Sequence, residues 1–203
     1  MSLVPELSPE KKLAFDRIIF FSDAVFAIAI TLLALELRVP EMPSTQVATE
    51  MLRQLGHMTP KFIGFVLSFT VIGIFWHAHH QDFQYIKCWD RRLILINFLL
   101  LLFVAFLPFP TALLDTYPAQ QITVSFYSGT VAALGMARWL MWQYATRGHR
   151  LVDQNLDEQF IARITRRTLI TPTIFLLSIG IAFFNPTLAM LSWCLIAAAL
   201  VVS

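Results

Sequence analysis

Long apolar stretches dominate this sequence of 203 residues and constrain its fold more than any other feature. Six stretches approach the roughly 20 residues that an α-helix needs to cross the hydrocarbon core of a bilayer. They are residues 15–37, 60–83, 93–114, 122–146, 168–184 and 186–202. Hydrophobic residues make up 57% of the chain and charged residues 14%, which is more apolar surface than a soluble fold of this length buries. The sequence therefore predicts an all-α integral membrane protein, a single domain of six transmembrane helices.

The last two stretches are short for membrane-spanning helices, and only Asn185 separates them. Pro186 lacks the amide donor that a continuing helix needs, and its ring suits the first turn of a new helix. We therefore expect a tight helical hairpin, with a single broken and partly buried segment as the alternative. Residues 148–167 are polar, and we expect a linker there that holds at most a short interfacial helix.

Basic residues gather in alternate loops between the apolar stretches. On one side of the membrane we place Lys11, Lys12, Arg17, Lys87, Arg91, Arg92, Arg147, Arg150, Arg163, Arg166 and Arg167, and on the other side Arg38, Arg53 and Lys61. Since Lys and Arg are enriched in cytoplasmic loops, both termini are predicted to be cytoplasmic. The net charge of +2 is too small to indicate a nucleic-acid partner.

Two polar residues, Ser22 and Asp23, lie inside the first apolar stretch. A central Asp costs roughly 2.5 to 3.5 kcal/mol on insertion scales, so it needs a partner or a purpose. Arg17 is six residues away, which is too far for a pair along one helix. Partners at a similar depth in other helices are Trp76, His77, His80 and Asn97. Either these side chains form a buried cluster with Asp23, or Asp23 is solvated near the interface.

Further along the same stretch, Ile28, Thr31, Leu32 and Leu35 follow helical spacing and share one face. Any membrane helix rich in leucine produces such a stripe by chance. The spacing alone therefore favours ordinary packing over a pore.

Two segments carry a resemblance to a known family. The first holds the pattern Arg-x-x-x-Phe-Ser-Asp at Arg17, Phe21, Ser22 and Asp23, and the second is Gly73-Ile-Phe-Trp-His-Ala-His-His80. Both resemble the transmembrane protein 175 family of potassium channels, whose prokaryotic members hold one six-helix repeat and assemble as tetramers. The chain has no internal repeat, so the resemblance implies the prokaryotic form, in the inner (plasma) membrane.

The resemblance also implies a mechanism, with four copies of the first helix around a central pore. Ile28 would form the main hydrophobic constriction, with rings of Thr31 and of Leu32 or Leu35 beside it. Glu36 would attract cations to the outer mouth, or is simply a solvated charge at a helix end. The side chains that would hold the pore helix in place are Arg17, Phe21, Ser22, Asp23, Trp76, His77, His80 and Asn97.

The expected partners are other copies of the chain, membrane lipids and permeating K⁺, with no cofactor and no bound metal. The sequence has no Thr-Val-Gly-Tyr-Gly, which excludes the usual carbonyl filter, so we expect only modest selectivity for K⁺ over Na⁺.

Two other functions stay open from the residues alone. His77, His79, His80 and Asp82 are close in sequence and suit a metal-dependent membrane enzyme, although the chain has only five histidines. A proton-coupled secondary transporter could instead use Asp23 with His77 or His80 as a relay.

Overall fold

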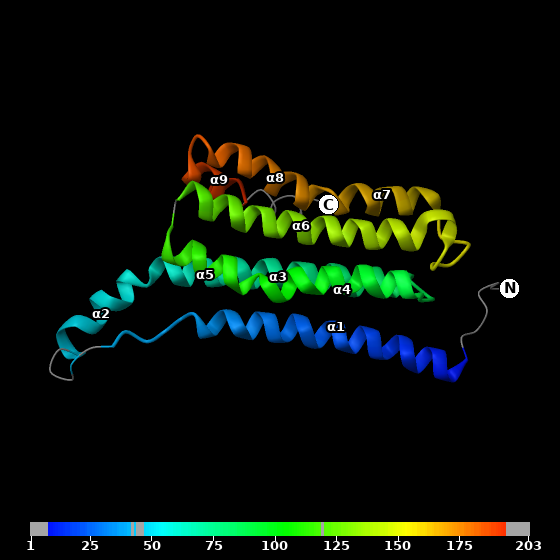
Figure 1. Cartoon of the computed structure of the whole chain (residues 1–203), viewed down its shortest axis with the longest axis horizontal. Helices are drawn as coiled ribbons and strands as arrows, with labels where there is room; N and C mark the ends of the chain where they lie inside the picture. The colour runs from blue at the N-terminus through cyan, green and yellow to red at the C-terminus, as the bar shows by residue number, and fades with distance from the viewer. Residues whose placement is uncertain (1–7, 42, 44–46, 119, 194–203) are drawn as a thin grey trace.

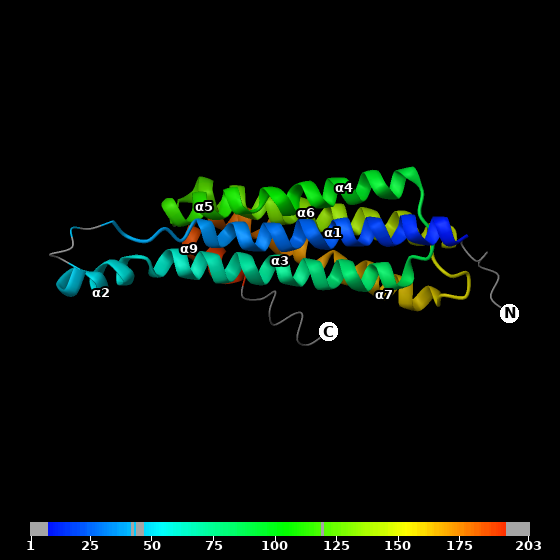
Figure 2. The same cartoon turned by 90° about the horizontal axis from the view of Figure 1, so that it is seen from below.

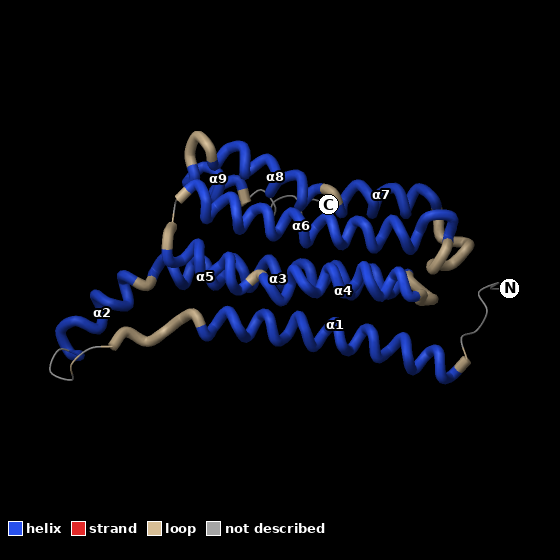
Figure 3. Tube along the Cα trace, viewed as in Figure 1, coloured by secondary structure: helices blue, strands red, loops and turns tan. Residues whose placement is uncertain are grey.

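The computed structural model describes residues 8–41, 43, 47–118 and 120–193, which form an elongated bundle of α-helices (Figure 1). In chain order the helices are α1 (Pro9–Leu35), α2 (Val47–His57), α3 (Thr59–Tyr85), α4 (Arg91–Phe106), α5 (Pro108–Thr116), α6 (Gln121–Thr146), α7 (Glu158–Thr168), α8 (Ile170–Ala182) and α9 (Pro186–Ser192), with a 3-10 turn at Arg147–His149. Loops join the helices (Figure 3). Among the described residues, β-structure is limited to one isolated bridge between Ile86 and Val152. The predicted all-α class is confirmed.

Within the described residues, four segments are long and apolar enough to cross a membrane, namely α1, α3, α4 with α5, and α7 with α8. α6 has 26 residues but is not among them. It lies between the layer of α3, α4 and α5 and the layer of α7, α8 and α9 (Figure 1). Because α6 contacts helices more than lipid, it tolerates polar side chains such as Ser128, which is fully buried. Length and composition alone therefore mark four of the six predicted spans.

The first helix begins earlier than predicted. α1 starts at Pro9 and ends at Leu35, against the predicted 15–37. The Ser8 hydroxyl caps its first turn by accepting a hydrogen bond from the Lys11 amide at 3.5 Å. These first turns are polar because they extend the helix beyond the apolar stretch. α2, which the apolar pattern did not predict, is a short helix beyond the end of the bundle (Figure 1).

The third and fifth predicted helices also differ from the structure. Leu107 divides the predicted 93–114 into α4 and α5, because Pro108 supplies no amide to continue the α-helical hydrogen bonds. The linker predicted at 148–167 contains a helix over its second half, where the sequence left room for a short one. There the Asp157 carboxylate accepts a hydrogen bond from the Phe160 amide at 3.0 Å and starts α7, which leads into α8. The loop before α7 is residues 150–157.

The chain turns back at Asn185, as the sequence predicts. Its side-chain oxygen accepts hydrogen bonds from the amides of Thr187 and Leu188, at 2.9 and 3.1 Å, and caps α9. The ring of Trp193 then lies 5.6 Å from that of Phe175 on α8. The remainder of the predicted helix 186–202 falls on residues 194–203, outside the described part of the chain.

Loops at the basic end of the bundle connect its layers. The Lys87 amide donates to the Leu151 carbonyl at 2.7 Å, which joins the α3–α4 loop to the loop before α7. The indole of Trp89 donates to the Lys11 carbonyl at 3.3 Å, which joins the same loop to the start of α1. The segments that the charge pattern assigns to the cytoplasm thus meet at one end.

Asp90, in the α3–α4 loop, is one of the acidic residues in this group of loops. It accepts hydrogen bonds from the Tyr144 hydroxyl at 2.5 Å and from the Leu93 amide at 2.8 Å. Partial burial acts to raise the pKa of Asp90, but these hydrogen bonds, together with the Arg92 amide and the charge of Arg150, lower it further than burial raises it. The pKa of this carboxyl group therefore lies below its ordinary value, and Asp90 is a carboxylate at neutral pH.

α1 lies at one edge of the bundle. In Figure 1 it is the layer farthest from α7, α8 and α9, and Figure 2 shows it in front of α3 and α4. It packs against α3, α4 and α5 on one side. Its other side has no neighbour among the described residues.

We predict that Gly135→Ala lowers the thermal stability of the protein. A Cβ at this position in α6 would lie 2.8 Å from Cδ of Pro172 on α8, and the rigid proline ring cannot rotate away. Overpacking of this kind costs about 1–3 kcal/mol. Gly129→Ala on the same helix is the control, because no heavy atom lies within 4 Å of its added Cβ. Melting curves in detergent should show a lower midpoint for Gly135→Ala only, and equal midpoints would contradict the close approach of α6 and α8.

Candidate functional site on the first helix

α1 has one face buried in the bundle and one face uncovered. Ser22, Phe26, Ala29 and Leu33 are buried, at intervals of four, three and four residues that match one side of a helix. The predicted pore residues lie on the uncovered part of the helix. In the single chain, Ile28 is 58% exposed, Leu32 40% and Leu35 69%, and Thr31 is also exposed.

Small residues share the uncovered face. Ala24, Ala27 and Ala34 are exposed in the single chain and lie within a turn of Ile28 or Thr31. Small side chains at such positions let helix backbones approach closely in a membrane. The uncovered face of α1 is therefore suited to contact with another helix.

Thr31 makes a local hydrogen bond that orients its hydroxyl. The hydroxyl donates to the Ile28 carbonyl, one turn earlier, at 2.8 Å. A hydroxyl has one donor and two acceptor lone pairs, so its oxygen can still accept. Glu36, at the end of α1, is exposed, and the structure gives it no ion pair within the described residues.

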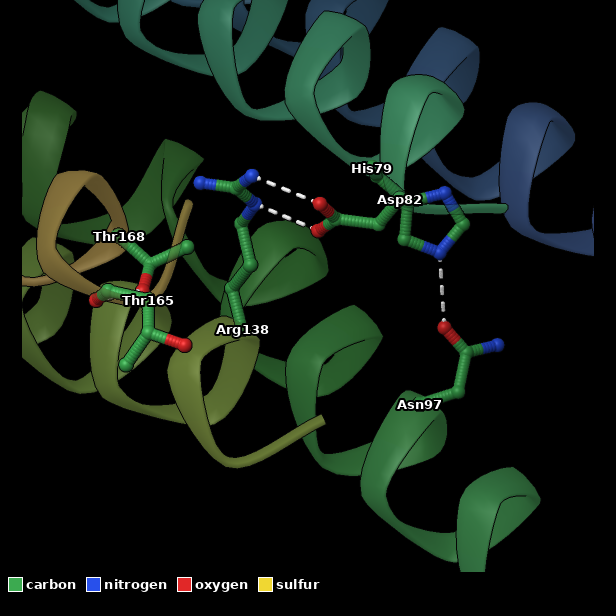
Figure 4. A network of polar contacts seen from close by, with 6 residues as sticks. All are labelled: His79, Asp82, Asn97, Arg138, Thr165 and Thr168. Atoms are coloured by element: carbon green, nitrogen blue, oxygen red, sulfur yellow. Dashed lines mark hydrogen bonds and ion pairs between the residues drawn. The ribbon is translucent and has the colours of Figure 1, made fainter. Parts of the chain in front are cut away.

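A chain of buried hydrogen bonds attaches α1 to α4 and α3. The Ser22 hydroxyl donates to the Ile18 carbonyl at 2.9 Å and accepts from the Asn97 amide at 2.9 Å. The Asn97 carbonyl oxygen in turn accepts from Nε2 of His79 at 2.9 Å (Figure 4). All three side chains are nearly inaccessible to solvent. Each of these three hydrogen bonds has a donor and an acceptor, so Ser22, Asn97 and His79 all have a polar partner inside the bundle.

Asp23 forms a second attachment between α1 and α3. Its carboxylate accepts a hydrogen bond from the Trp76 indole at 2.9 Å. The ring of His80 stacks on that indole, with ring centroids 5.9 Å apart. Neither Asp23 nor Trp76 is fully buried, so this contact lies nearer the edge of the bundle than the Ser22 chain.

The structure brings together some of the predicted anchoring residues and separates others. Ser22 forms a hydrogen bond with Asn97, and Asp23 forms one with Trp76. The histidine that joins the buried hydrogen bonds is His79, whereas the sequence suggested His77 or His80. His77 instead contacts Gln81 on its own helix at 3.1 Å. His79 could have been found from helical spacing, since it follows the buried positions 68, 72 and 75 of α3.

Arg17 and Phe21 lie on the side of α1 that faces α4. The ring of Phe21 packs edge-on against Phe98, with centroids 5.7 Å apart. Arg17 lines the same shallow hollow between the two helices and makes no ion pair with a described residue. The contact between Phe21 and Phe98 therefore helps to hold α1 against α4.

The strongest polar contact joins α3 to α6 and was not predicted. Arg138 donates two hydrogen bonds to Asp82, from Nε to Oδ2 at 2.8 Å and from Nη2 to Oδ1 at 2.9 Å (Figure 4). The Asp82 side chain is 2% exposed and that of Arg138 15%. Two opposite charges in separate apolar segments are the sequence signal that could have indicated this pair. The ion pair with Arg138 occupies both carboxylate oxygens of Asp82, which is therefore unavailable to the nearby histidines.

The histidine cluster therefore does not form a metal site in the described residues. His77, His79 and His80 have different partners, namely Gln81, Asn97 and the Trp76 ring. No group of three or more His, Cys, Asp or Glu in the described part of the chain could hold a metal ion.

Neither His77 nor His80 hydrogen-bonds to Asp23 in the described structure, which was the pairing expected for a proton relay. Asp23 bonds to the Trp76 indole, and the ring of His80 stacks on that indole.

The fold and the site define an all-α, multi-pass membrane protein. Residues 17–108 match the family described as endosomal/lysosomal potassium channel TMEM175. A potassium channel of Streptomyces collinus is 37% identical, over 86% of this chain and 85% of the relative. A potassium channel of Chamaesiphon minutus is 34% identical, over 83% and 84%. The crystal structure of a TMEM175 homologue from Chamaesiphon minutus matches with a TM-score of 0.77 and 30% identity, over 92% of this chain and 98% of the homologue.

The chain belongs to the TMEM175 family. Both segments that carry the sequence resemblance, residues 17–23 and 73–80, lie within the matched residues 17–108. The family is one of channels, so the protein is not the metal-dependent enzyme that the histidines left open.

We predict that Arg138→Met destabilises the protein strongly, because it leaves the Asp82 carboxylate buried without its cation. Breaking a buried pair from one side costs about 3–5 kcal/mol. The double variant Asp82→Leu/Arg138→Met removes both charges and should regain most of the loss. Melting midpoints of the wild type, both single variants and the double variant form a complete cycle. A double variant as unstable as Arg138→Met would show that the pairing energy is not the cause.

Proposed function

We propose that this potassium channel of the TMEM175 family is a homotetramer of six-helix subunits, with four copies of α1 around a central pore. We place it in the inner (plasma) membrane of a prokaryote, with both termini in the cytoplasm. Bacterial relatives of similar length and the gathering of basic loops at one end of the bundle support this placement. The solved Chamaesiphon minutus homologue bears the description potassium-selective.

The observation that carries the proposal is the uncovered face of α1. Beyond Asp23 the helix is apolar on nearly every side, but the bundle covers only the side of Ser22, Phe26 and Leu33. Its small residues would allow neighbouring copies to pack closely, and Ile28, Thr31 and Leu35 would then project toward a shared axis.

Ile28 would form the constriction that closes the pore. A narrow ring of four isoleucine side chains excludes water, and an ion that enters without water meets a large desolvation cost. Leu32 and Leu35 would extend the apolar segment toward the outer side by about one and two further turns of helix. Glu36 would lie beyond them at the outer mouth, where its charge raises the local concentration of cations.

Thr31 would provide the polar ring next to the constriction. Because its hydroxyl proton is donated to the Ile28 carbonyl, the oxygen presents lone pairs to a passing cation. Four such oxygens replace only part of a water shell. Since K⁺ holds its hydration water less tightly than Na⁺, incomplete replacement penalises Na⁺ more, and the selectivity expected from this arrangement is modest.

The hydrogen bonds of Ser22, Asp23, Trp76 and Asn97 would act on the pore indirectly. They fix the rotation of α1 about its own axis, and so decide which residues face the pore. His79 takes part through Asn97.

We predict that Ile28→Asn raises the potassium leak through the closed channel. An amide side chain in the ring holds water and removes the dewetted barrier. Leu177→Asn on α8 is the control, since Leu177 is 63% exposed and Ile28 58% in the single chain, and the same polar group is introduced. The measurement is K⁺ and Na⁺ flux from liposomes, with single-channel recording in bilayers. Equal currents in Ile28→Asn and the wild type would refute the constriction at Ile28.

We predict that Asp23→Ala lowers the fraction of tetramer, because α1 then loses its hydrogen bond to α3 and its uncovered face is less well oriented. Trp76→Phe removes the same hydrogen bond from the other partner and should have a similar effect. Asp16→Ala, on the same helix, is the control. Mass measurement of the purified variants by light scattering would decide, and a normal tetramer in both Asp23→Ala and Trp76→Phe would argue against this anchoring role.

A further inference from the structure

A groove of about 580 Å³ opens on the side of the bundle between α3 and the α7–α8 segment. The α3 wall supplies Gly73, His77 and Gln81, the α7 wall supplies Ile164 and Arg167, and Arg138 of α6 lies at the base. None of these residues belongs to the uncovered face of α1. The pore and its anchors therefore leave this groove unexplained.

The groove continues along α3 into a second hollow. This second space, of about 510 Å³, shares Thr70 and Ile74 with the first and extends past Val66 and Phe62 toward the outer end of α3. Its lining is almost entirely apolar, with Phe175, Met190 and Trp193 on the opposite wall. Together the two hollows form one surface groove, which is polar at its inner end and apolar toward the middle of the membrane.

The polar end of the groove carries positive charge. Asp82 neutralises Arg138 through Nε and Nη2, and in Figure 4 the third nitrogen of the guanidinium points away from Asp82, toward the side of Thr168. Arg167 also borders an adjoining hollow of about 490 Å³, which Arg163 and Arg166 line as well. α7 holds these three arginines and one acidic residue, Glu158. Its net charge is therefore positive where it meets the groove.

The charged residues lie at the depth of the cytoplasmic leaflet. Arg138 is eight residues from the inner end of α6 and Arg167 is nine residues from the inner end of α7, which places them about 12 and 14 Å from those ends at 1.5 Å per residue. A ligand that fits has an anionic group at this level and an apolar chain that follows α3 outward.

We propose that the groove binds an anionic phospholipid of the cytoplasmic leaflet. Its phosphate would lie beside Gln81, Arg167 and the outward nitrogen of Arg138, with one acyl chain over Gly73 and Ile74. Gly73 suits this role, because no heavy atom lies within 4 Å of the Cβ position and the chain can approach the helix backbone. If copies meet through α1, then α7 and α8 stay at the opposite edge of each bundle (Figure 1). The site does not depend on the proposed pore.

Native mass spectrometry of the purified full chain tests the proposal. The protein is mixed in detergent with equal amounts of palmitoyl-oleoyl phosphatidylglycerol and phosphatidylcholine, and the ratio of the two bound lipids is measured. The wild type should bind mainly phosphatidylglycerol. Arg167→Gln should lower this preference about fivefold, which is the effect of one basic side chain near an anionic headgroup. Gly73→Leu fills the groove and should lower the binding of both lipids.

Two control variants separate the groove from general effects. Gly180→Leu introduces the same side chain at another glycine with open surroundings, and should leave lipid binding unchanged. Arg147→Gln removes a basic residue outside the groove, and should keep the preference for phosphatidylglycerol.

An equal ratio of the two lipids in the wild type, or unchanged binding in both Arg167→Gln and Gly73→Leu, would overturn the proposal. A change of oligomeric mass in Gly73→Leu alone would also overturn it, by identifying the groove as a contact between subunits. The experiment does not measure ion flux. A negative result would therefore overturn the lipid site without bearing on the proposed pore.

Discussion

The hydrogen bonds between α1 and its neighbours are the interaction on which the arrangement of this protein depends. In a bilayer, an apolar helix gains little by turning one apolar face inward, because lipid chains are as apolar as leucine. α1 is apolar on nearly every side, so the hydrophobic effect does not fix its rotation. The links from Ser22 to Asn97 and from Asp23 to Trp76 do so. These two contacts therefore decide which residues face outward from α1.

α3 has a central role because its polar side chains contact three other helices. Trp76 reaches α1, His79 reaches α4 and Asp82 reaches α6. Asp82 lies about one turn of helix from His79, and His79 about one turn from Trp76. A change at one contact therefore acts directly on the helix that makes the others, and the first three spans are coupled to the remaining spans through α3 as well as through the loops at the inner end.

Much of the fold could be predicted from apolar stretches, because a bilayer demands long helices with few charges. The bounds of α3 and α6 differ from the predicted 60–83 and 122–146 by no more than two residues at either end. The predicted bounds were wrong where polar residues continue a helix, as at the start of α1, since hydropathy does not register capping by Ser8. A short helix within 148–167 was allowed by the sequence, but its start at the Asp157 cap could not be placed for the same reason. In the site, Ser22, Asp23, Trp76 and Asn97 were predicted to be close together. His79 was missed because adjacent histidines differ only in helical rotation, and the Asp82–Arg138 pair because its members are 56 residues apart.

The uneven distribution of polar contacts along α1 has a mechanical consequence. Its hydrogen bonds to other described parts of the protein, through Lys11, Ser22 and Asp23, lie in the inner two thirds of the helix. Beyond Asp23 its contacts with the other described helices are van der Waals contacts. A tilt about Asp23 moves Leu35, about 18 Å further along the axis, more than twice as far as Ile28, which is about 7.5 Å away. Small rotations of this helix are thus amplified at its outer end, where separation from neighbouring elements requires no hydrogen bond to break.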